Sequence, residues 1–426
     1  MVKINVIFKK LRGKSILVLG FGREGRSSLA FIQKYLPHAV VGVADGNALA
    51  MNGLNAERIK IYSGENYLDA INDYDIVLKT PGISLKGKDV DLAKITSQTD
   101  LFLEEFHDRI IGVTGTKGKS TTSTLIHHIL KESGRDVFLV GNIGVPVFDI
   151  IEKITQNSII VFELSAHQLQ YTHRRPHIGI LLNVFEEHLD HFGTFAAYRD
   201  AKLNIIRKMG ERDWAVTKEE FSFEFADSSA HTINYEYYNY DIDWDKVQLK
   251  GEHNKLNINA ALCACYAYGI PVDELIPHLY TFKPLEHRQE LVGTFSGVTF
   301  YNDSISTIPQ AAIAALNTIK NVSFLLLGGF DREIDYTPLI EHLKKNPVRH
   351  LLFTGNAGKR MLEMLKNIDY QGDICVFNSL QEAFSVVKNK AENGDICLLS
   401  PAAASYDQYK NFEERGRMFK ELASKF

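Results

Sequence analysis

The sequence predicts an α/β fold of three domains, in which parallel sheets are covered by helices. Three observations predict it. The chain has 426 residues, which is too many for one hydrophobic core. Short apolar runs alternate with helical patterns along its length. Two of these runs lead directly into glycine-rich turns that open helices. We expect the domains to span residues 1–97, 98–283 and 284–426.

The composition narrows the class of protein. Hydrophobic residues make up 45% and charged residues 23%, the proportions of a soluble globular protein. The net charge of −4 gives no general attraction to nucleic acid or to a membrane surface. The sequence has neither an apolar run long enough to span a membrane nor the pattern of a signal peptide. The four cysteines form no C-x-x-C pair. We therefore expect a cytoplasmic monomer with reduced thiols and small-molecule partners.

The first domain is predicted by a strand, a glycine turn and a second strand. Residues 14–19 form an apolar strand that leads into Gly20–Gly25, which matches the G-x-G-x-x-G spacing. The next strand ends roughly 20 residues later at Asp45, where an acid contacts a ribose in Rossmann-like domains. Many α/β units carry such a turn for packing alone, so the motif supports a dehydrogenase poorly. A further strand, residues 76–79, ends in a turn at Gly82.

The strongest motif opens the central domain. The apolar run 110–114 ends in a glycine-rich turn, and Lys119 and Ser120 then open a helical pattern. In such a loop the backbone N–H groups and the helix N-terminus bind phosphates. Lys119 would reach the outer phosphates, and Ser120 would ligate Mg²⁺. The usual spacing has glycine at position 113, where this chain has Val113. A merely flexible turn is the weaker interpretation, because the lysine and the serine stand at the required places.

Polar residues follow the other strands of the central domain. The runs 137–140, 158–162 and 178–182 describe a parallel sheet with its ligand site at one edge. Glu163 follows the second run and is placed to hold Mg²⁺ beside the phosphate loop. As an isolated feature it is equally consistent with a solvated acid at a strand end. Residues 219–250 are aromatic and acidic with weak periodicity, and we expect a hairpin-rich insertion there.

The densest group of potential ligands is Glu186–His191. His188 and His191 are three residues apart and would share one face of a helix. A structural zinc site needs more ligands of the right type. A role beside Mg²⁺-ATP is therefore the favoured interpretation, and an exposed polar turn is the alternative. Lys202 lies in a helical stretch and, taken alone, is predicted to be a surface lysine.

The third domain follows a short linker at residues 283–285 and again alternates strands with helices. Strands are expected at residues 298–301, 322–327, 350–353, 374–377 and 396–399, and an amphipathic helix at 411–426. Polar loops follow three of the strands and begin at Asn302, Gly328 and Ser400. Such loops share one edge of a parallel sheet, which suits a small polar substrate.

Taken together, these motifs resemble the Mur ligase family over nearly the whole chain. The resemblance rests on the ordered set of motifs, because no single motif is specific enough. The matching segments are Gly20–Gly25, Gly115–Thr122, Gly141–Gly144, Glu163–Leu169, Glu187–Asp190, Tyr198–Lys202, Gly251–Asn257, His287–Arg288, Asn302–Ser304, Leu399–Ser405 and Asn411–Gly416.

This resemblance implies an ATP-dependent ligase that forms an amide bond through an acyl phosphate. Within the family, the motifs are those of the branch that joins D-glutamate to UDP-N-acetylmuramoyl-L-alanine in peptidoglycan precursor synthesis. The implied architecture is a Rossmann-like UDP-binding domain, a P-loop ATPase-like central domain and a Rossmann-like glutamate-binding domain. The implied cofactors are ATP and two Mg²⁺ ions, with carbamylated Lys202 as one metal ligand.

The resemblance also implies roles for individual residues. The residues implied to be catalytic are Lys119, His188 and Lys202. Those implied to bind ATP are Gly115, Thr116, Lys117, Gly118, Lys119, Ser120, Thr121, Asn257, Arg288 and Asp303. Those implied to hold metal ions are Ser120, Glu163, His188 and Lys202. Those implied to contact the UDP substrate or glutamate are Arg23, Glu24, Asp45, Gly82, Asn142, Thr307, Arg332, Ser405 and Phe412.

Three residues depart from the usual pattern of the family. Lys117 stands where Asn is usual, Ile305 where Lys is usual, and Arg332 where Lys is usual. Arginine keeps a charge for a carboxylate but presents a planar fork in place of an ammonium. Because Ile305 and Arg332 belong to motifs around the amino-acid pocket, attachment of L-glutamate stays open as an alternative to D-glutamate.

Two further functions fit part of the pattern. A folylpolyglutamate synthase-like ligase shares the ATP core, but it lacks a first domain of the UDP-binding type. A nucleotide-binding regulator would use ATP only as a switch. The combination of Glu163, His188 and Lys202 favours chemistry over that second role.

Overall fold

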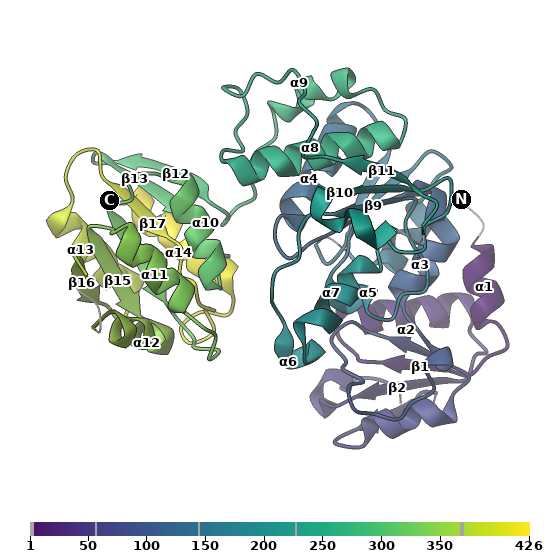
Figure 1. Cartoon of the computed structure of the whole chain (residues 1–426). Helices are drawn as coiled ribbons and strands as arrows, with labels where there is room; N and C mark the ends of the chain where they lie inside the picture. The colour runs from purple at the N-terminus through teal and green to yellow at the C-terminus, as the bar shows by residue number, and fades with distance from the viewer. Residues whose placement is uncertain (1–3, 56–57, 144, 226–227, 367–369) are drawn as a thin grey trace. The chain divides into compact units, whose positions relative to one another are not determined.

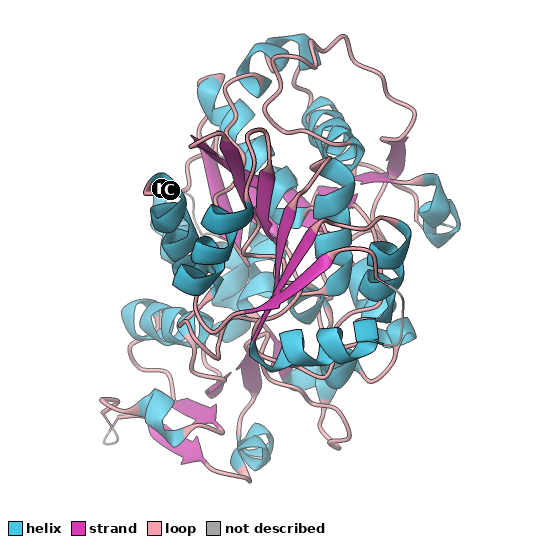
Figure 2. Cartoon of the chain, turned by 90° about the vertical axis from the view of Figure 1, so that its left-hand side faces the viewer, coloured by secondary structure: helices cyan, strands magenta, loops and turns pink. Residues whose placement is uncertain are grey.

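The computed structural model describes residues 4–55, 58–143, 145–225, 228–366 and 370–426. The chain forms two compact units, whose elements are labelled in Figure 1: Met1–Val247 with His253–Phe282, and Gln248–Glu252 with Lys283–Phe426. In both units helices pack against sheets, as the cyan helices and magenta strands of Figure 2 show. No helix in the described ranges is both long enough and apolar enough to cross a membrane.

The first sheet of the first unit is parallel and has the strand order β3-β2-β1-β4-β5, which is a Rossmann-like arrangement. Its strands are β1 (Ile16–Leu19), β2 (Val41–Asp45), β3 (Lys60–Ser63), β4 (Ile76–Lys79) and β5 (Ile95–Thr96). The helices of this part are α1 (Asn5–Leu11), α2 (Arg23–Tyr35) and α3 (Gln98–Phe106). The helix α2 starts at Arg23, within the motif Gly20–Gly25, and buries Leu29 and Ile32 in the core.

The second sheet of this unit is also parallel, in the order β11-β10-β9-β6-β8-β7. Its strands are β6 (Ile110–Thr114), β7 (Val137–Gly141), β8 (Ile159–Glu163), β9 (Ile178–Leu181), β10 (Trp214–Thr217) and β11 (His231–Asn234). The helices are α4 (Lys119–Glu132), α5 (Ala166–Leu169), α6 (Leu189–Phe192), α7 (Phe195–Leu203), α8 (Glu252–Ala267) and α9 (Ile276–Leu279). The central strands are wholly buried, which explains why they are apolar on both faces.

One apolar core joins the two sheets of the first unit. Residues of α1, α2 and α3 pack with residues of the central sheet in a single buried cluster. The rings of Phe31 and Phe148 lie 4.4 Å apart between centroids, and Ser27 Oγ donates a hydrogen bond of 2.6 Å to Asp149 Oδ1. These contacts pack α2 against the 3-10 helix η5 (Val147–Lys153), which follows β7 of the central sheet.

The predicted hairpin-rich insertion at 219–250 is wrong for the described residues of that region. It contains a 3-10 helix, η6 (Glu219–Phe225), and then β11, which pairs parallel with β10. Of the aromatic residues here, Phe221 and Tyr235 are buried, whereas Phe223 and Tyr237 are exposed. The hydroxyl of Tyr235 donates a hydrogen bond of 2.7 Å to the carbonyl of Leu182.

The sheet of the second unit has the order β12-β13-β17-β14-β15-β16 and is parallel except for β12, which is antiparallel to β13. Its strands are β12 (Glu290–Phe295), β13 (Val298–Asn302), β14 (Phe324–Gly328), β15 (His350–Thr354), β16 (Asp373–Val376) and β17 (Ile396–Leu399). Its helices are α10 (Pro309–Thr318), α11 (Thr337–Lys345), α12 (Gly355–Lys366), α13 (Leu380–Lys390) and α14 (Phe412–Ser424). Separate apolar clusters cover its two faces.

Candidate functional site

The glycine-rich turn lies between β6 and α4, at the carboxyl edge of the central sheet. Gly118 has a φ of +87°, and a Cβ on this residue would lie 2.5 Å from Asn257 Oδ1. Both facts require glycine at this position. They also place Asn257, on α8, directly against the turn. The structure thus brings together two residues that the resemblance assigns to ATP.

Two residues outside the motif hold the loop in shape. Asn183, just after β9, accepts a hydrogen bond of 2.8 Å from the Lys117 N–H and donates one of 3.1 Å to the Lys117 carbonyl. The hydroxyl of Thr116 lies 3.1 Å from that of Tyr198 on α7. Neither Asn183 nor Tyr198 was predicted as a site residue. Asn183 could have been found from its position, because it is a polar residue directly after a buried apolar run.

Lys119 is the first residue of α4, and Ser120 and Thr121 follow it in the first helical turn. Its ammonium donates hydrogen bonds to two carbonyls of the loop, at 2.8 Å to Gly115 and 3.0 Å to Thr116. The cation therefore lies over the loop, beside the N-terminus of a 14-residue helix. Both features favour bound anions, and phosphates above all.

Glu163 ends β8 and is fully buried. Its Oε1 accepts a hydrogen bond of 2.7 Å from Asn142 Nδ2, whereas its Oε2 is buried without a hydrogen-bond partner among the described residues. A buried carboxylate oxygen without a partner is costly unless a ligand neutralises it. Hard cations such as Mg²⁺ prefer oxygen ligands of this kind, so the residues fit the metal that the resemblance implies.

Lys202 on α7 is buried, which corrects the prediction of a surface lysine that the bare sequence made. Its ammonium donates a hydrogen bond of 2.8 Å to the carbonyl of Gly115 and lies 4.9 Å from the ring centroid of Tyr198. Burial, reinforced by the positive charge of Lys119, holds the pKa of Lys202 well below its usual value. The lowered pKa favours the neutral amine form of Lys202 beside the phosphate loop.

His188 precedes α6 and adopts a left-handed backbone conformation with a φ of +58°. It therefore does not share a helical face with His191, as the spacing had suggested. The ring of His167 lies between them, 4.9 Å from His188 and 4.4 Å from His191 between centroids. Within the described part of the chain, no three His, Cys, Asp or Glu side chains are grouped so as to hold a metal, so a zinc site is not supported.

Lys117, which departs from the family pattern, faces an acid. Its ammonium lies 3.2 Å from Glu187 Oε1. Burial raises the pKa of Glu187, but Lys117, His188 and Lys119 outweigh it and lower the pKa overall. The carboxylate stays ionised beside three basic side chains, so the loop's extra positive charge is balanced within the site.

The first sheet presents its predicted residues at its carboxyl edge. Asp45 accepts hydrogen bonds from two backbone N–H groups, at 2.6 Å from Phe21 and 2.8 Å from Asn47. It thus holds the glycine turn in place. The turn that ends at Gly82 packs close to the glycine turn, because a Cβ on Gly20 would lie 2.0 Å from Thr80 Oγ1.

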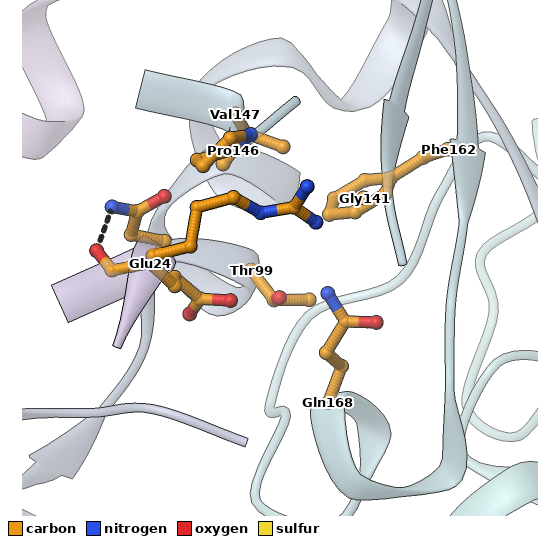
Figure 3. Close-up of a pocket in the computed structure, with 9 residues that line it drawn as sticks. Glu24, Thr99, Gly141, Pro146, Val147, Phe162 and Gln168 are labelled. Carbon is orange, nitrogen blue, oxygen red and sulfur yellow. Dashed lines mark hydrogen bonds between the residues drawn. The ribbon is translucent and has the colours of Figure 1, made fainter. Parts of the chain in front are cut away.

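Arg23 and Glu24 line a cavity of about 30 Å³ between the two sheets of the first unit. Figure 3 shows Glu24 and Thr99 on one side of this cavity, with Gly141, Phe162 and Gln168 across from them. Asn142, predicted to contact the same substrate, follows Gly141 in the chain. Of the residues predicted for the UDP substrate, Arg23 and Glu24 line this cavity, whereas Asp45, Gly82 and Asn142 do not. Gln98 and Gln168 also line it, and neither was predicted as a site residue.

In the second unit, Asp303 follows β13 and is buried. It accepts hydrogen bonds from the hydroxyls of Ser306 and Ser400 and from the Gln289 N–H. Burial raises the pKa of Asp303 to about 6, although these hydrogen bonds and Arg288 oppose the rise. Arg288 and Asp303, both assigned to ATP by the resemblance, are thus electrostatically coupled.

Three of the residues predicted for glutamate, Thr307, Arg332 and Ser405, lie on the loops after β13, β14 and β17, and the fourth, Phe412, begins α14. Arg332 donates a hydrogen bond of 2.8 Å to the carbonyl of Thr307, which places these two residues together. Ser405 is buried, and the carbonyl of Phe412 accepts a hydrogen bond of 2.8 Å from Ser304.

A buried arginine on α14 ties these loops together. Arg415 donates hydrogen bonds to Ser304 Oγ at 3.0 Å, to the Ser304 carbonyl at 2.8 Å and to the Ala403 carbonyl at 3.1 Å. It belongs to the matched motif, but no role was predicted for it. A charged residue inside an amphipathic helix is the only sign of such a role in the sequence.

Comparison with protein families and known proteins places these features in context. Residues 113–243 match the Mur ligase middle domain, and residues 287–403 match the Mur ligase glutamate ligase domain. A UDP-N-acetylmuramoylalanine--D-glutamate ligase of Symbiobacterium thermophilum is 35% identical over 397 residues, which cover 85% of this chain and 87% of the relative. A ligase of the same name from Clostridium botulinum, strain Langeland, is 30% identical over 410 residues, covering 88% and 89%.

Solved structures share the fold at lower sequence identity. The MurF ligase of Thermotoga maritima, crystallised with ADP, aligns over 100% of both chains with a TM-score of 0.59 and 20% identity. A MurF structure from Acinetobacter baumannii aligns with a TM-score of 0.60 and 16% identity, covering 96% of this chain and 92% of that one.

Proposed function

Because the chain belongs to the Mur ligase family, we propose that it is an ATP-dependent ligase that adds D-glutamate to UDP-N-acetylmuramoyl-L-alanine. The reaction makes an amide bond through an acyl phosphate and serves peptidoglycan precursor synthesis in the cytoplasm. The observation that carries the proposal is the phosphate loop with the buried Glu163 and Lys202 beside it. The names of the relatives support the choice of substrates.

The chain's own residues suit the first step. In that step the alanyl carboxylate attacks the γ-phosphate of ATP, and ADP leaves. Charge on the transferring phosphoryl group is stabilised by positioned cations and N–H groups. Lys119 and the N–H groups of residues 115–121 supply both at the loop. Asn257 lies against Gly118, and this contact supports a role for Asn257 in binding the nucleotide. Arg288 and Asp303 are proposed to contact the nucleotide as well.

The metal ligands follow from the chemistry of the donors. Ser120 and Glu163 would hold one Mg²⁺, and His188 and Lys202 a second. When bound, Mg²⁺ would neutralise negative charge on the phosphate oxygens while the phosphoryl group is transferred. Glu163 fits this role because its Oε2 is buried without a hydrogen-bond partner in the described residues.

Lys202 would serve as a ligand after carbamylation. The neutral amine attacks CO₂, an N–C bond forms, and a proton is lost, so that the side chain ends in a carboxylate. Only the neutral amine has the lone pair for this attack, and burial favours that form by lowering the pKa of Lys202. The low pKa and the position next to the Gly115 carbonyl support this modification.

The three segments 1–97, 98–283 and 284–426 would then serve the UDP moiety, ATP and glutamate respectively. In the first, Arg23, Glu24, Asp45 and Gly82 are proposed for the UDP substrate, with Asn142 from the second. In the third, Thr307, Arg332, Ser405 and Phe412 are proposed for the incoming amino acid. In the second step its amine attacks the acyl phosphate, and inorganic phosphate leaves.

Phosphate release from ATP tests the proposal. We expect release by the purified protein only when Mg²⁺, UDP-N-acetylmuramoyl-L-alanine and D-glutamate are all present. The product should gain the mass of one glutamyl residue. Release with a folate acceptor, or no release with any acceptor, would contradict the proposed function.

L-Glutamate in a parallel reaction tests the second candidate. Ile305 and Arg332 are the reason to test this alternative, because both replace a lysine that is usual around the amino-acid pocket. A kcat/KM higher for L-glutamate than for D-glutamate would keep the ligase chemistry and reverse the assignment of the amino acid.

A further inference from the structure

The loop between β14 and α11 carries Arg332, which is exposed. The loop begins with a close approach to another part of the second unit. Gly329 has a φ of +138°, and a Cβ on this residue would lie 2.2 Å from the carbonyl oxygen of Ala404. The N–H of Phe330 donates a hydrogen bond of 2.9 Å to the same carbonyl. The start of the loop is therefore fixed against the loop that carries Ser405, another residue proposed for the incoming amino acid.

Arg360, on α12, contacts the next part of this loop at three points. Its Nη1 lies 3.0 Å from Asp331 Oδ2, its Nη2 donates a hydrogen bond to the carbonyl of Ile334, and its guanidinium carbon lies 4.7 Å from the ring centroid of Tyr336. The side chain of Tyr336 is buried in the apolar core of the second unit, so the ring under the guanidinium is itself fixed. The two polar contacts lie on either side of Arg332 in the chain.

Asp331 uses its other carboxylate oxygen to shape the turn around Arg332. Its Oδ1 accepts a hydrogen bond of 2.9 Å from the N–H of Glu333. Glu333 has a φ of +59°, a left-handed conformation that is unfavourable for a residue with a long side chain. Such a conformation persists only where the surrounding structure imposes it. The carboxylate of Asp331, which bonds both to this N–H and to Arg360, is what imposes it here.

The guanidinium of Arg332 is directed towards the loop after β13. Its Nη2 donates a hydrogen bond of 2.8 Å to the carbonyl of Thr307, a further residue proposed for the incoming amino acid. A guanidinium has five donors in a planar fork and binds a carboxylate through two parallel hydrogen bonds. Because this geometry tolerates little displacement, the position of the Arg332 backbone decides how well a carboxylate is bound.

We propose that Arg360 is a positioning residue that holds the segment 331–334 in shape, so that Arg332 meets a carboxylate of the incoming amino acid. This inference rests on the proposed function for the identity of that amino acid. Arg360 acts through Asp331 and the carbonyl of Ile334, which lie on either side of Arg332. Without Arg360 the segment would have to become ordered when the amino acid binds, and that cost would weaken binding.

Steady-state kinetics of the full-length protein tests this role, with the enantiomer of glutamate that the wild type uses. Arg360→Lys keeps the positive charge but loses the planar fork, so the KM for glutamate should rise about tenfold. The values of kcat, of the KM for ATP and of the KM for the UDP substrate should stay within about twofold of the wild type. Arg360→Met also removes the charge and should raise the KM for glutamate further. Lys359→Met, at the exposed neighbouring position of α12, is the matched control and should resemble the wild type.

Two further measurements separate positioning from a general effect on folding. The double variant Arg332→Met/Arg360→Lys should have the same KM for glutamate as Arg332→Met alone, because Arg360 acts through the placement of Arg332. Hydrogen–deuterium exchange of the protein without substrates is the second measurement. The peptide that covers residues 329–336 should exchange faster in Arg360→Lys than in the wild type, and Lys359→Met should not change it.

The outcomes distinguish this inference from the proposed function. If the wild type releases no phosphate with either enantiomer of glutamate, the proposed function fails, and the assignment of Arg332 to the amino acid fails with it. If the wild type is active and Arg360→Lys keeps the wild-type KM for glutamate, the positioning role alone is wrong. Additive effects of the two substitutions on this KM, equal losses in kcat and in all three KM values, or unchanged exchange of residues 329–336 would also overturn it.

Discussion

The side chain of Lys202 shows how a single residue takes its chemistry from its surroundings. The same lysine would be an inert cation on the surface. Here burial and the nearby Lys119 lower its pKa, and its nitrogen lies 2.8 Å from the carbonyl of Gly115. The carbamate proposed above follows from that environment.

Replacement of this lysine should be partly reversible by added chemicals. Lys202→Ala should lose at least about 100-fold in kcat, because a proposed metal ligand is removed. Formate or acetate at high concentration should restore part of the activity by filling the space of the carbamate. Release of inorganic phosphate and mass spectrometry of the product both measure the loss of activity and its restoration. Wild-type activity in the unsupplemented variant would refute a role for a carbamate.

Gly118 offers a second test at the scale of one residue. Gly118→Ala should raise the KM for ATP at least about tenfold, because a Cβ would displace Asn257 and strain a left-handed backbone. Gly134→Ala is the matched control: its φ of +80° is similar, but nothing lies within 4 Å of the added Cβ. Equal effects of the two substitutions on the KM for ATP would show that strain alone matters, and would remove Asn257 from the argument.

The helix α14 holds two loops of the second unit together through Arg415. Arg415 on α14 donates hydrogen bonds to the loops after β13 and β17. Arg415→Met should lower the free energy of unfolding of this unit by about 3 kcal/mol, because several buried carbonyls lose their donor. Arg417→Met, at an exposed position of the same helix, is the control. Differential scanning calorimetry measures both; equal melting temperatures for the two variants would contradict the role of Arg415.

Most strands and helices could be predicted from the sequence, whereas the pairing of the strands was harder to predict. Buried parallel strands such as β6 and β8 are continuous apolar runs, and glycine turns mark their ends. The strand β12 was missed because it is half exposed and interrupted by a bulge near Gly293. The parallel β11 was mistaken for a hairpin, because local composition does not reveal which strand a segment pairs with.

The sequence could predict those residues of the candidate site whose type and spacing form a motif. The loop and Glu163 follow from residue types at known spacings, whereas the helical face predicted to join His188 and His191 does not form. Lys202 required the resemblance, because its burial arises from the packing of α7 on the loop. Arg415 is a charged residue whose partner Ser304 comes from a distant part of the chain, and such a contact leaves no local pattern in the sequence.

At the scale of the whole molecule, each compact unit has its own apolar core. A histidine–aspartate cluster lies in the first unit, at the amino ends of β9 and β10. Asp213 lies 3.1 Å from His107 Nε2 and 3.3 Å from His177 Nδ1. Burial opposes ionisation of Asp213, but the two histidines lower its pKa. The hydrogen bond to Asp213, outweighing burial, raises the pKa of His107.

This cluster should shape the pH dependence of stability. The contribution of Asp213 is present above its ordinary pKa of 3.8 and is lost as the pH falls through its lowered value. The contribution of His107 is present below its ordinary pKa of 6.5 and is lost as the pH rises through its raised value. The contributions of Asp213 and His107 to stability should both be present between pH 3.8 and pH 6.5.

Asp213→Asn should therefore destabilise the first unit by about 2 kcal/mol near pH 5.5 and by less near pH 9. Calorimetry at several pH values measures this, and the transition of the second unit should not move. Asp108→Asn, at an exposed acid beside the same histidine, should have a smaller effect. A loss of stability in Asp213→Asn that is independent of pH would show that the charges do not matter.

The close fit between Gly118 and Asn257 also bears on inhibitor resistance. A competitor of ATP that contacts the backbone of this turn would bind where the chain cannot add even a methyl group without displacing Asn257. Substitutions that evade such a compound would have to arise elsewhere, because a change at Gly118 would impair the enzyme before it excluded the drug.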